Sequence, residues 1–423
     1  MRETTPTPER VYLVGVLHAG VRPEALDQQM RELAELTRTA GGEVVGSDVQ
    51  RRDEIEPALY VGRGKIAEIR ERHGELGYEL VICNEDLSPR QQRNLEKELG
   101  VRVIDRTDLI LDIFAQHAHT REGRLQVEVA RLHHWLPRLI GAYTYSRQVG
   151  GIGTRGGPGE QQIEIERRRV RRRLRDLDRE LEQVRAQREQ QRESRRRAQL
   201  ATVAIVGYTN AGKSTLLNTL TQAGVLAENQ LFATLDPTTR RWRLPSGREV
   251  LLTDTVGFIQ KLPTDLVASF RATLEEVTSA DVVLQVVDAT DPAAEAQART
   301  VDSVLDDLGA GAAPRVVALN KADGLGPAGR RRALRAFHER YASVVAISAL
   351  RRQGVEELGA ALGKVMQRDM VDMELLVPYG RESVLVELRR EGVVEETSYT
   401  DRGTLARARA PRHAVHRFQS FAV

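Results

Sequence analysis

The sequence contains a single cysteine, Cys83, among 423 residues. One cysteine excludes an internal disulfide and any metal site built from several thiolates. Aromatic residues make up only 4% of the chain, and no apolar run approaches the roughly 18 residues that a membrane-spanning helix needs. The first residues contain no apolar signal region, so we expect a cytoplasmic protein without a membrane span.

An excess of charge of one sign is also missing. The net charge is only +3, with 29% charged and 41% apolar residues. These proportions are typical of an ordinary globular protein, and the length leaves room for two to four domains. The net charge is too small to indicate a partner, so the function must be sought in local motifs.

The first such motif is GYTNAGKST at residues 207–215, directly after the apolar run 201–206. It matches the phosphate-binding loop G-x-x-x-x-G-K-[ST] in its required place between a strand and a helix. Backbone N–H groups of the loop can surround a polyphosphate, and the positive end of the helix dipole favours the same anion. We predict that Lys213 reaches the β- and γ-phosphates and that the Ser214 hydroxyl ligates Mg²⁺. The predicted contact residues are Gly207, Tyr208, Thr209, Asn210, Ala211, Gly212, Lys213, Ser214 and Thr215.

A second motif, NKAD at residues 320–323, follows the short apolar run 315–319. The Asp323 carboxylate can accept two hydrogen bonds from guanine N1–H and N2–H₂, a pair that adenine does not offer. We expect Asn320 to tie this loop to the phosphate-binding loop. The alternative is an ordinary turn, which the upstream phosphate loop disfavours. The predicted base-contacting residues are Asn320, Lys321, Ala322 and Asp323 and, in a later loop whose N–H groups face the guanine O6, Ser348, Ala349 and Leu350.

Two further segments are predicted to respond to the third phosphate. DTVG at residues 254–257 supplies an acid that holds a Mg²⁺-bound water and a glycine N–H that contacts the γ-phosphate. FATLDP at residues 232–237 contains Thr234, which we expect to close on Mg²⁺, with Thr238 as the alternative. The predicted nucleotide contacts here are Phe232, Ala233, Thr234, Leu235, Asp236, Asp254, Thr255, Val256 and Gly257. Catalytic roles are predicted for Lys213, Thr234 and Gly257, and Mg²⁺ ligands are predicted to be Ser214, Thr234 and, through water, Asp254.

The residue after the DTVG motif is Phe258. Ras-like enzymes place a glutamine here, which orients the attacking water. Because phenylalanine has no polar group, we predict slow hydrolysis by the isolated chain and faster hydrolysis when a partner orders the switch loops or supplies a group in trans. A compatible alternative is that Phe258 simply packs while another residue positions the water.

The rest of the chain predicts four domains. Residues 1–119 alternate strands with helices, which predicts a small α/β domain with a mainly parallel sheet. Residues 200–367 have the same alternation and form the P-loop GTPase domain of a chain of α/β class. Residues 368–423 predict a small α+β C-terminal domain, and the plain interpretation of its basic stretch 402–417 is ordinary exposed surface. The expected strands are 11–17, 42–46, 80–83, 101–104, those near 202, 249, 282, 315 and 343, and 373–377 and 393–399; the expected helices outside the GTPase domain are 22–40, 65–73, 88–99 and 381–390.

Residues 120–199 predict an antiparallel helical hairpin because apolar residues recur at heptad spacing on both sides of a glycine-rich loop. The seam residues are Leu125, Val129, Leu132, Leu136 and Leu139, and then Ile163, Val170, Leu174, Leu177, Leu181 and Val184. His133 and His134 lie beside Trp135 with no acidic or cysteine partner nearby in the sequence, so we interpret them as helix-face residues rather than metal ligands.

The tip of this hairpin and the arginine-rich start of its second helix suit a phosphate backbone, because a glycine loop allows close approach and arginines neutralise charge. The alternative is a solvated helix with ion pairs to nearby acids. The predicted RNA or ribosome contacts are Gly151, Gly153, Arg155, Gly156, Arg167, Arg168, Arg171 and Arg172.

With these motifs, the chain resembles the HflX family of ribosome-associated GTPases over nearly all of its length. The resemblance is carried by YVGRGK at 60–65, by the glycine-rich segment 150–160 and the following QQIE, by FATLDP at 232–237 and by DTVGF at 254–258. The family pattern R-G-P-G-E-T-Q is replaced by RGGPGEQQ at 155–162, with one extra glycine and no threonine.

The resemblance implies a GTP/GDP- and Mg²⁺-dependent switch that binds the 50S ribosomal subunit and its ribosomal RNA as a monomer. It also implies that the hairpin tip reaches toward the peptidyl-transferase region, that the GTP-bound protein splits or rescues stalled ribosomes under stress, and that hydrolysis accompanies release. Two alternatives stay open. One is a GTPase of large-subunit assembly, and the other is an RNA-binding or RNA-remodelling protein in which the nucleotide is a conformational ligand.

Overall fold

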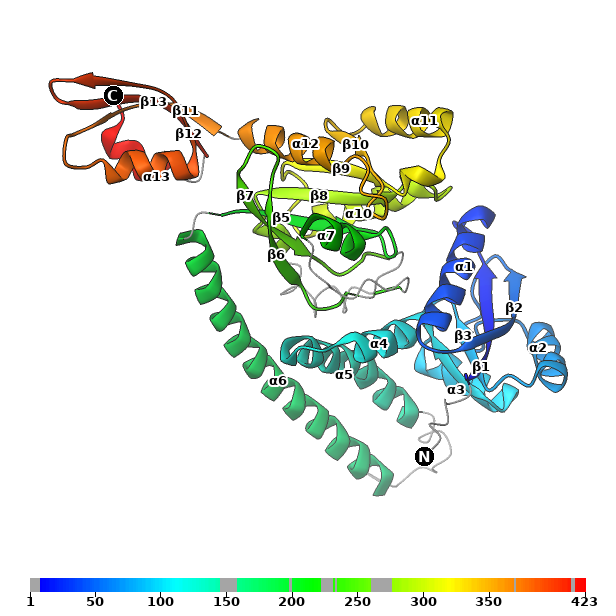
Figure 1. The fold of residues 1–423 in the computed structure, drawn as a ribbon. Helices are drawn as coiled ribbons and strands as arrows, with labels where there is room; N and C mark the ends of the chain where they lie inside the picture. The colour runs from blue at the N-terminus through cyan, green and yellow to red at the C-terminus, as the bar shows by residue number, and fades with distance from the viewer. Residues whose placement is uncertain are drawn as a thin grey trace, which may run out of the picture. The chain divides into compact units, whose positions relative to one another are not determined.

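The computed structural model describes residues 8–144, 158–197, 200–221, 231–232, 234–259, 276–368, 370–411 and 415–423. The chain forms two compact units, and the elements of both are labelled in Figure 1. The first unit comprises residues 1–185, 228–236 and 260–272, and the second comprises residues 186–227, 237–259 and 273–423. Within the described residues, no helix combines the length and the apolar character needed to cross a membrane.

The first unit begins with a four-stranded, all-parallel sheet in the order β2-β1-β3-β4, as the alternation of strands and helices predicts. Its core is an apolar cluster that includes Tyr12, Tyr60 and Val81. The strands are β1 (Arg10–Leu17), β2 (Glu43–Arg51), β3 (Leu80–Cys83) and β4 (Arg102–Asp105), and the helices are α1 (Pro23–Thr39), α2 (Arg63–Leu76), α3 (Pro89–Leu99) and α4 (Arg106–His117). Strand β2 extends five residues beyond the predicted end at residue 46.

Local sequence explains why one of these helices was predicted and another was missed. The serine cap expected for α3 is confirmed as a capping box, in which Ser88 Oγ accepts from the Gln91 N–H and Gln91 Oε1 accepts from the Ser88 N–H. Helix α4 was not predicted because buried residues occupy most of its circumference, so its sequence has no clear amphipathic period.

The predicted hairpin helices are α5 (Arg121–Thr144) and α6 (Pro158–Arg197). The heptad positions form one apolar seam between them, with Leu177 fully buried at its centre. The seam contains Leu125, Val129, Leu174, Leu177 and Leu181, with Leu132, Leu136, Val170 and Val184 packed against it. The tip, residues 145–157, and the side chains of Leu139 and Ile163 lie outside the described part of the chain.

The second unit contains a six-stranded sheet in the order β10-β9-β8-β5-β7-β6. Every pairing is parallel except that of β6 with β7. The strands are β5 (Ala201–Gly207), β6 (Thr238–Arg243), β7 (Glu249–Asp254), β8 (Val282–Asp288), β9 (Arg315–Asn320) and β10 (Val344–Ala346); its helices include α7 (Lys213–Thr221), α10 (Ala294–Asp307), η2 (Ala322–Gly324), α11 (Pro327–His338) and α12 (Val355–Arg368). Edge strand β6 was missed because its sequence, TTRRWR, has one buried apolar residue.

The C-terminal part of this unit is a three-stranded antiparallel sheet, β11-β13-β12. Its elements are β11 (Met370–Val377), α13 (Ser383–Glu391), β12 (Val393–Thr400), β13 (Gly403–Pro411), α14 (Val415–Phe418) and η3 (Gln419–Phe421). Strand β13 takes up most of the basic stretch 402–417 and is the central strand of the sheet, so only part of this stretch is exposed surface. Its alanines, Ala406, Ala408 and Ala410, are buried and alternate with arginines.

Candidate GTP-binding site

Three of the predicted nucleotide-binding motifs meet at one edge of the second unit's sheet. The phosphate-binding loop follows β5, Asp254 ends β7, and Asn320 ends β9. These strands run parallel, so their carboxyl ends lie at the same edge, which is where ligands bind in open α/β sheets.

Lys213 begins helix α7 beneath this loop. Its side chain is 7% exposed, and its Nζ donates to the Tyr208 carbonyl oxygen at 3.0 Å. Burial lowers the pKa of Lys213 to about 8, against the opposing effect of the Asp254 charge. A Cβ added to Gly257 would lie 2.9 Å from the Lys213 Nζ, so the DTVG glycine is a direct neighbour of the lysine. The site therefore brings together a buried cation and the segment predicted to respond to the third phosphate.

Two predicted magnesium ligands also lie together. Ser214 Oγ donates to Asp254 Oδ2 at 2.7 Å, and Asp254 is fully buried. A hydroxyl and a carboxylate at the edge of a phosphate-binding loop are the oxygen donors that Mg²⁺ prefers in phosphate sites. This donor set fits a magnesium ion.

Asn320 joins the phosphate-binding loop to the base-reading loops, as predicted. Its Nδ2 donates to the Ala211 carbonyl oxygen at 2.8 Å, and its Oδ1 accepts the Ala349 N–H at 2.9 Å. The backbone of Gly212 has φ +91°, and a Cβ there would lie 2.3 Å from Asn320 Nδ2. Only glycine combines this backbone with such a close approach, so the sequence of the loop and the position of Asn320 depend on one another.

The Asp323 carboxylate is held in its ionised form. A hydrogen bond from Ser348 is the foremost cause that lowers the pKa of Asp323, and Arg351 Nε lies 3.1 Å from its Oδ2. The neighbouring Lys321 pairs with Asp288 at 2.7 Å. An ionised carboxylate accepts hydrogen bonds only, which is the requirement for reading two guanine donors.

The later loop differs in detail from its predicted role of offering N–H groups to the base. The Ser348 N–H donates to the Gln353 carbonyl oxygen at 3.0 Å, and the Ala349 N–H is the one that Asn320 accepts. Leu350 is 82% exposed. The Ser348 N–H therefore closes its own loop, and the Ala349 N–H joins that loop to Asn320.

Phe258 packs beside the phosphate-binding loop. It is 2% exposed, and its backbone exchanges two hydrogen bonds with the phosphate-binding loop. The Phe258 N–H donates to the Gly207 carbonyl oxygen at 3.0 Å, and the Thr209 N–H donates to the Phe258 carbonyl oxygen at 2.8 Å. The expectation that this residue packs is confirmed. It offers no polar side chain to a water molecule.

Other predicted contacts lie in different surroundings. Thr255 is buried and its hydroxyl donates to the Ile205 carbonyl oxygen at 2.8 Å, so it supports the sheet. Thr238 lies in β6 opposite Asp254. The described residues of the FATLDP segment up to Asp236 belong to the first unit, and Ala233 lies outside the described residues.

The arginine cluster of α6 is partly neutralised. Glu164 pairs with Arg167 at 3.5 Å and with Arg168 at 3.3 Å. Arg171 and Arg172 are exposed, and neither has an ion pair among the described residues. The predicted tip contacts Gly151, Gly153, Arg155 and Gly156 lie outside the described part of the chain.

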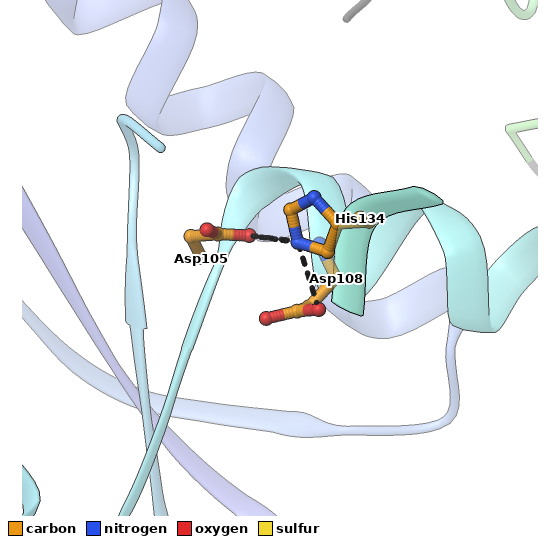
Figure 2. Close-up of side chains that lie close together, drawn as sticks. All are labelled: Asp105, Asp108 and His134. Atoms are coloured by element: carbon orange, nitrogen blue, oxygen red, sulfur yellow. Dashed lines mark hydrogen bonds and ion pairs between the residues drawn. The ribbon is translucent and has the colours of Figure 1, made fainter. Parts of the chain in front are cut away.

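A polar cluster in the first unit was missed from the sequence. His134 on α5 lies 3.0 Å from Asp108 and 3.6 Å from Asp105 (Figure 2). The expectation that His134 has no acidic partner was wrong, because the two acids come from the junction of β4 and α4, far away in sequence. Arg138 also contacts Asp105, so a cation already neutralises the buried carboxylate. We interpret the cluster as a clamp between α4 and α5.

Family models match three consecutive parts of the chain. Their descriptions are "GTP-binding GTPase N-terminal" for residues 27–115, "GTP-binding GTPase Middle Region" for residues 117–195 and "50S ribosome-binding GTPase" for residues 202–321. Among curated relatives, GTPase HflX of Caldanaerobacter subterraneus is 43% identical, with 100% of this chain and 96% of the relative covered. GTPase HflX of Escherichia coli is 44% identical over 70% of each chain. A crystal structure of SsGBP in complex with GDP is 26% identical, with a TM-score of 0.48 and 84% of this chain and 98% of that chain covered.

The phosphate-binding loop and the NKAD loop, joined by Asn320 at the edge of a parallel sheet, define a P-loop GTPase. The protein binds GTP and hydrolyses it. The identity to relatives across the whole chain is more specific, and the chain belongs to the GTPase HflX family.

Proposed function

We propose that this GTPase is a switch that associates with the large (50S) ribosomal subunit and splits or rescues stalled ribosomes under stress. The observation that carries the proposal is the position of Phe258, whose buried side chain occupies the place of a water-orienting glutamine. An enzyme without that group hydrolyses GTP slowly until a partner completes the site. The "50S ribosome-binding GTPase" description of residues 202–321 favours the large subunit as that partner.

In this proposal, the chain's own residues bind and position the nucleotide. Lys213 contacts the β- and γ-phosphates, and Asp323 accepts the two guanine donors. Ser214, Thr234 and, through water, Asp254 hold Mg²⁺, which neutralises phosphate charge when it is bound. The N–H of Gly257 contacts the third phosphate, so that its loss on hydrolysis releases the surrounding segment.

The exposed arginines of α6 support an RNA-rich partner. Arg171 and Arg172 project from the helix that follows the glycine-rich tip, and their charges are free of ion pairs among the described residues. Contacts of arginine with phosphates release counterions, so ribosome binding should weaken as salt rises. Their exposure equally suits a solvated helix, and a salt titration distinguishes the two.

The test is GTP turnover by the full chain alone, with purified 50S subunits, with an assembly precursor and with free ribosomal RNA. We expect strong stimulation by mature 50S subunits and little by naked RNA. Stimulation by the precursor alone would instead assign the protein to large-subunit assembly. Equal turnover under all four conditions, together with intact cellular activity of a hydrolysis-deficient variant, would favour the RNA-remodelling alternative.

Two variants show whether the measured turnover belongs to this site and this surface. Lys213→Ala should abolish GTP binding and all turnover. Replacing Arg171 and Arg172 by Gln should leave turnover by the isolated chain unchanged but flatten the salt dependence of 50S binding. Arg175→Gln, an exposed change one turn further along α6, is the matched control for that pair. If the salt dependence of 50S binding is unaltered, Arg171 and Arg172 do not contact the ribosome and belong to a solvated helix.

A further inference from the structure

The segment that contains the predicted switch threonine is packed on the first unit. Leu231, Phe232 and Leu235 are 8%, 2% and 2% exposed. The Phe232 ring meets the Phe114 ring of α4 edge-on, with centroids 4.7 Å apart and an angle of 77° between the planes. The Leu231 N–H donates to Thr39 Oγ1 at 3.3 Å. The residues on the N-terminal side of Thr234 are therefore held by helices α1 and α4.

Asp236, two residues after Thr234, is held at the start of α5. Asp236 Oδ2 accepts the N–H groups of His119 and Thr120 at 3.0 and 2.8 Å. Its other oxygen, Oδ1, accepts the Thr120 hydroxyl, which in turn accepts the Gly123 N–H at 3.0 Å. Helix α5 begins at Arg121, so Asp236 places a negative charge at a helix N-terminus, where backbone donors and the helix dipole stabilise it.

A glycine in the first turn of α5 allows this contact. A Cβ added to Gly123 would lie 2.5 Å from Asp236 Oδ1 and 3.3 Å from Thr120 Oγ1. Glycine is less favourable than alanine within a helix. The close approach of Asp236 gives a physical reason for a residue that weakens the helix.

We propose that Asp236 is a positioning residue for the switch segment. With Phe232 it fixes both sides of Thr234 to the first unit, and its carboxylate links this segment to the first helix of the hairpin. The inference rests on the proposed role of Thr234 as the residue that closes on Mg²⁺ with GTP.

The consequence is thermodynamic coupling between the nucleotide and the start of α5. Closure of Thr234 on the magnesium of bound GTP must strengthen or weaken the hydrogen bonds of Asp236. Binding of GDP does not require that closure. The free energy of the hydrogen bonds that Asp236 accepts from His119 and Thr120 then contributes to the affinity for GTP but not to that for GDP. By reciprocity, binding of GTP must change the stability of these hydrogen bonds by the same amount.

The experiment uses the full chain without ribosomes. Gly123→Ala favours the helix but excludes Asp236, and Thr120→Val removes the hydroxyl partner without adding bulk at Gly123. Gly74→Ala is the matched control, since it also lies in a helix of the first unit and a Cβ there meets nothing within 4 Å. The affinities for GDP and for a non-hydrolysable GTP analogue are measured with Mg²⁺, together with hydrogen exchange at the His119 and Thr120 amides.

We expect faster exchange at both amides in Gly123→Ala and Thr120→Val. The ratio of GTP-analogue to GDP affinity should change by at least about fivefold, the lower range of a typical coupling, with GDP affinity unchanged. In the unaltered chain, the two nucleotides should give different exchange rates at these amides. Faster exchange with a ratio within about twofold of the Gly74→Ala value would overturn the proposal, as would slow exchange retained in both variants. Failure of the 50S test leaves this ratio unaffected, so the two proposals can fail separately.

Discussion

At the scale of single residues, the site depends on a few side chains whose surroundings change their chemistry. Asn320 holds two loops with one amide, and Asp323 is kept ionised by Ser348 and Arg351. Lys213 is the opposite case, because burial disfavours its charged form. The motif predicts that this lysine contacts phosphates, but its altered pKa follows only from the packing around it.

The pKa of Lys213 predicts a pH dependence of nucleotide binding. With a pKa of about 8 in the nucleotide-free chain, the lysine is charged below pH 8 and loses its proton above it. A bound polyphosphate favours the charged form, so binding above pH 8 takes up a proton. We expect GDP affinity to be level near pH 7 and to fall by up to about tenfold per pH unit above pH 8. Calorimetric titrations in buffers of different ionisation enthalpy measure this uptake, and no proton uptake near pH 9 would contradict the assignment.

At the scale of elements, strands and amphipathic helices follow from sequence pattern, whereas the contacts between helices do not. The hairpin seam could be predicted because leucine spacing alone selects the faces that meet. The clamp between α4 and α5 could not, since His134 and its two acids belong to separate segments. Helix α4 could not be predicted from periodicity either, because buried residues occupy most of its circumference.

The clamp predicts that the first unit loses stability at high pH. Burial alone would lower the pKa of His134, but hydrogen bonds and charges from Asp105 and Asp108 outweigh it and raise the pKa to about 9. A histidine whose pKa is raised by folding stabilises the protein fully below its unfolded value of about 6.5, and this contribution is lost as pH rises through about 9.

The free energy of unfolding of the unaltered chain should therefore fall between about pH 6.5 and pH 9. In His134→Gln this fall should be much smaller, while stability at pH 6 should be lower than in the unaltered chain. His133→Gln changes the exposed neighbour on the same helix and should keep the full pH dependence. Denaturant unfolding at several pH values gives the comparison, and equal curves for His134→Gln and His133→Gln would show that the clamp does not titrate as described.

At the scale of the whole molecule, the chain consists of two compact units with different chemistry. The phosphate-binding loop, Asp254 and the NKAD loop belong to the second unit. The described residues of the FATLDP segment up to Asp236 belong to the first unit, although they lie between α7 and β6 in the sequence. The polypeptide therefore passes from one unit to the other between Asp236 and Pro237, within the segment predicted to respond to the nucleotide.

This division predicts two unfolding transitions with different responses to GDP. A ligand stabilises the unit that binds it, by about 2.7 kcal/mol when free ligand is a hundredfold above its dissociation constant. GDP should therefore raise the melting temperature of the second unit's transition and leave that of the first nearly unchanged. Differential scanning calorimetry of the full chain, with Lys213→Ala as the control that does not respond, makes the comparison. A single transition that moves as a whole would show that the units unfold together.

The sequence by itself determined the elements and motifs that depend on short-range order along the chain. The phosphate-binding loop, the NKAD loop, the parallel sheets and the heptad seam are each specified by spacing within a few tens of residues. Only the tertiary structure decided which distant residues meet. Asp236 caps a helix more than a hundred residues earlier, and His134 contacts acids at the junction of β4 and α4. Local periodicity carries no information about such pairs, because they exist only after folding has brought separate surfaces into contact.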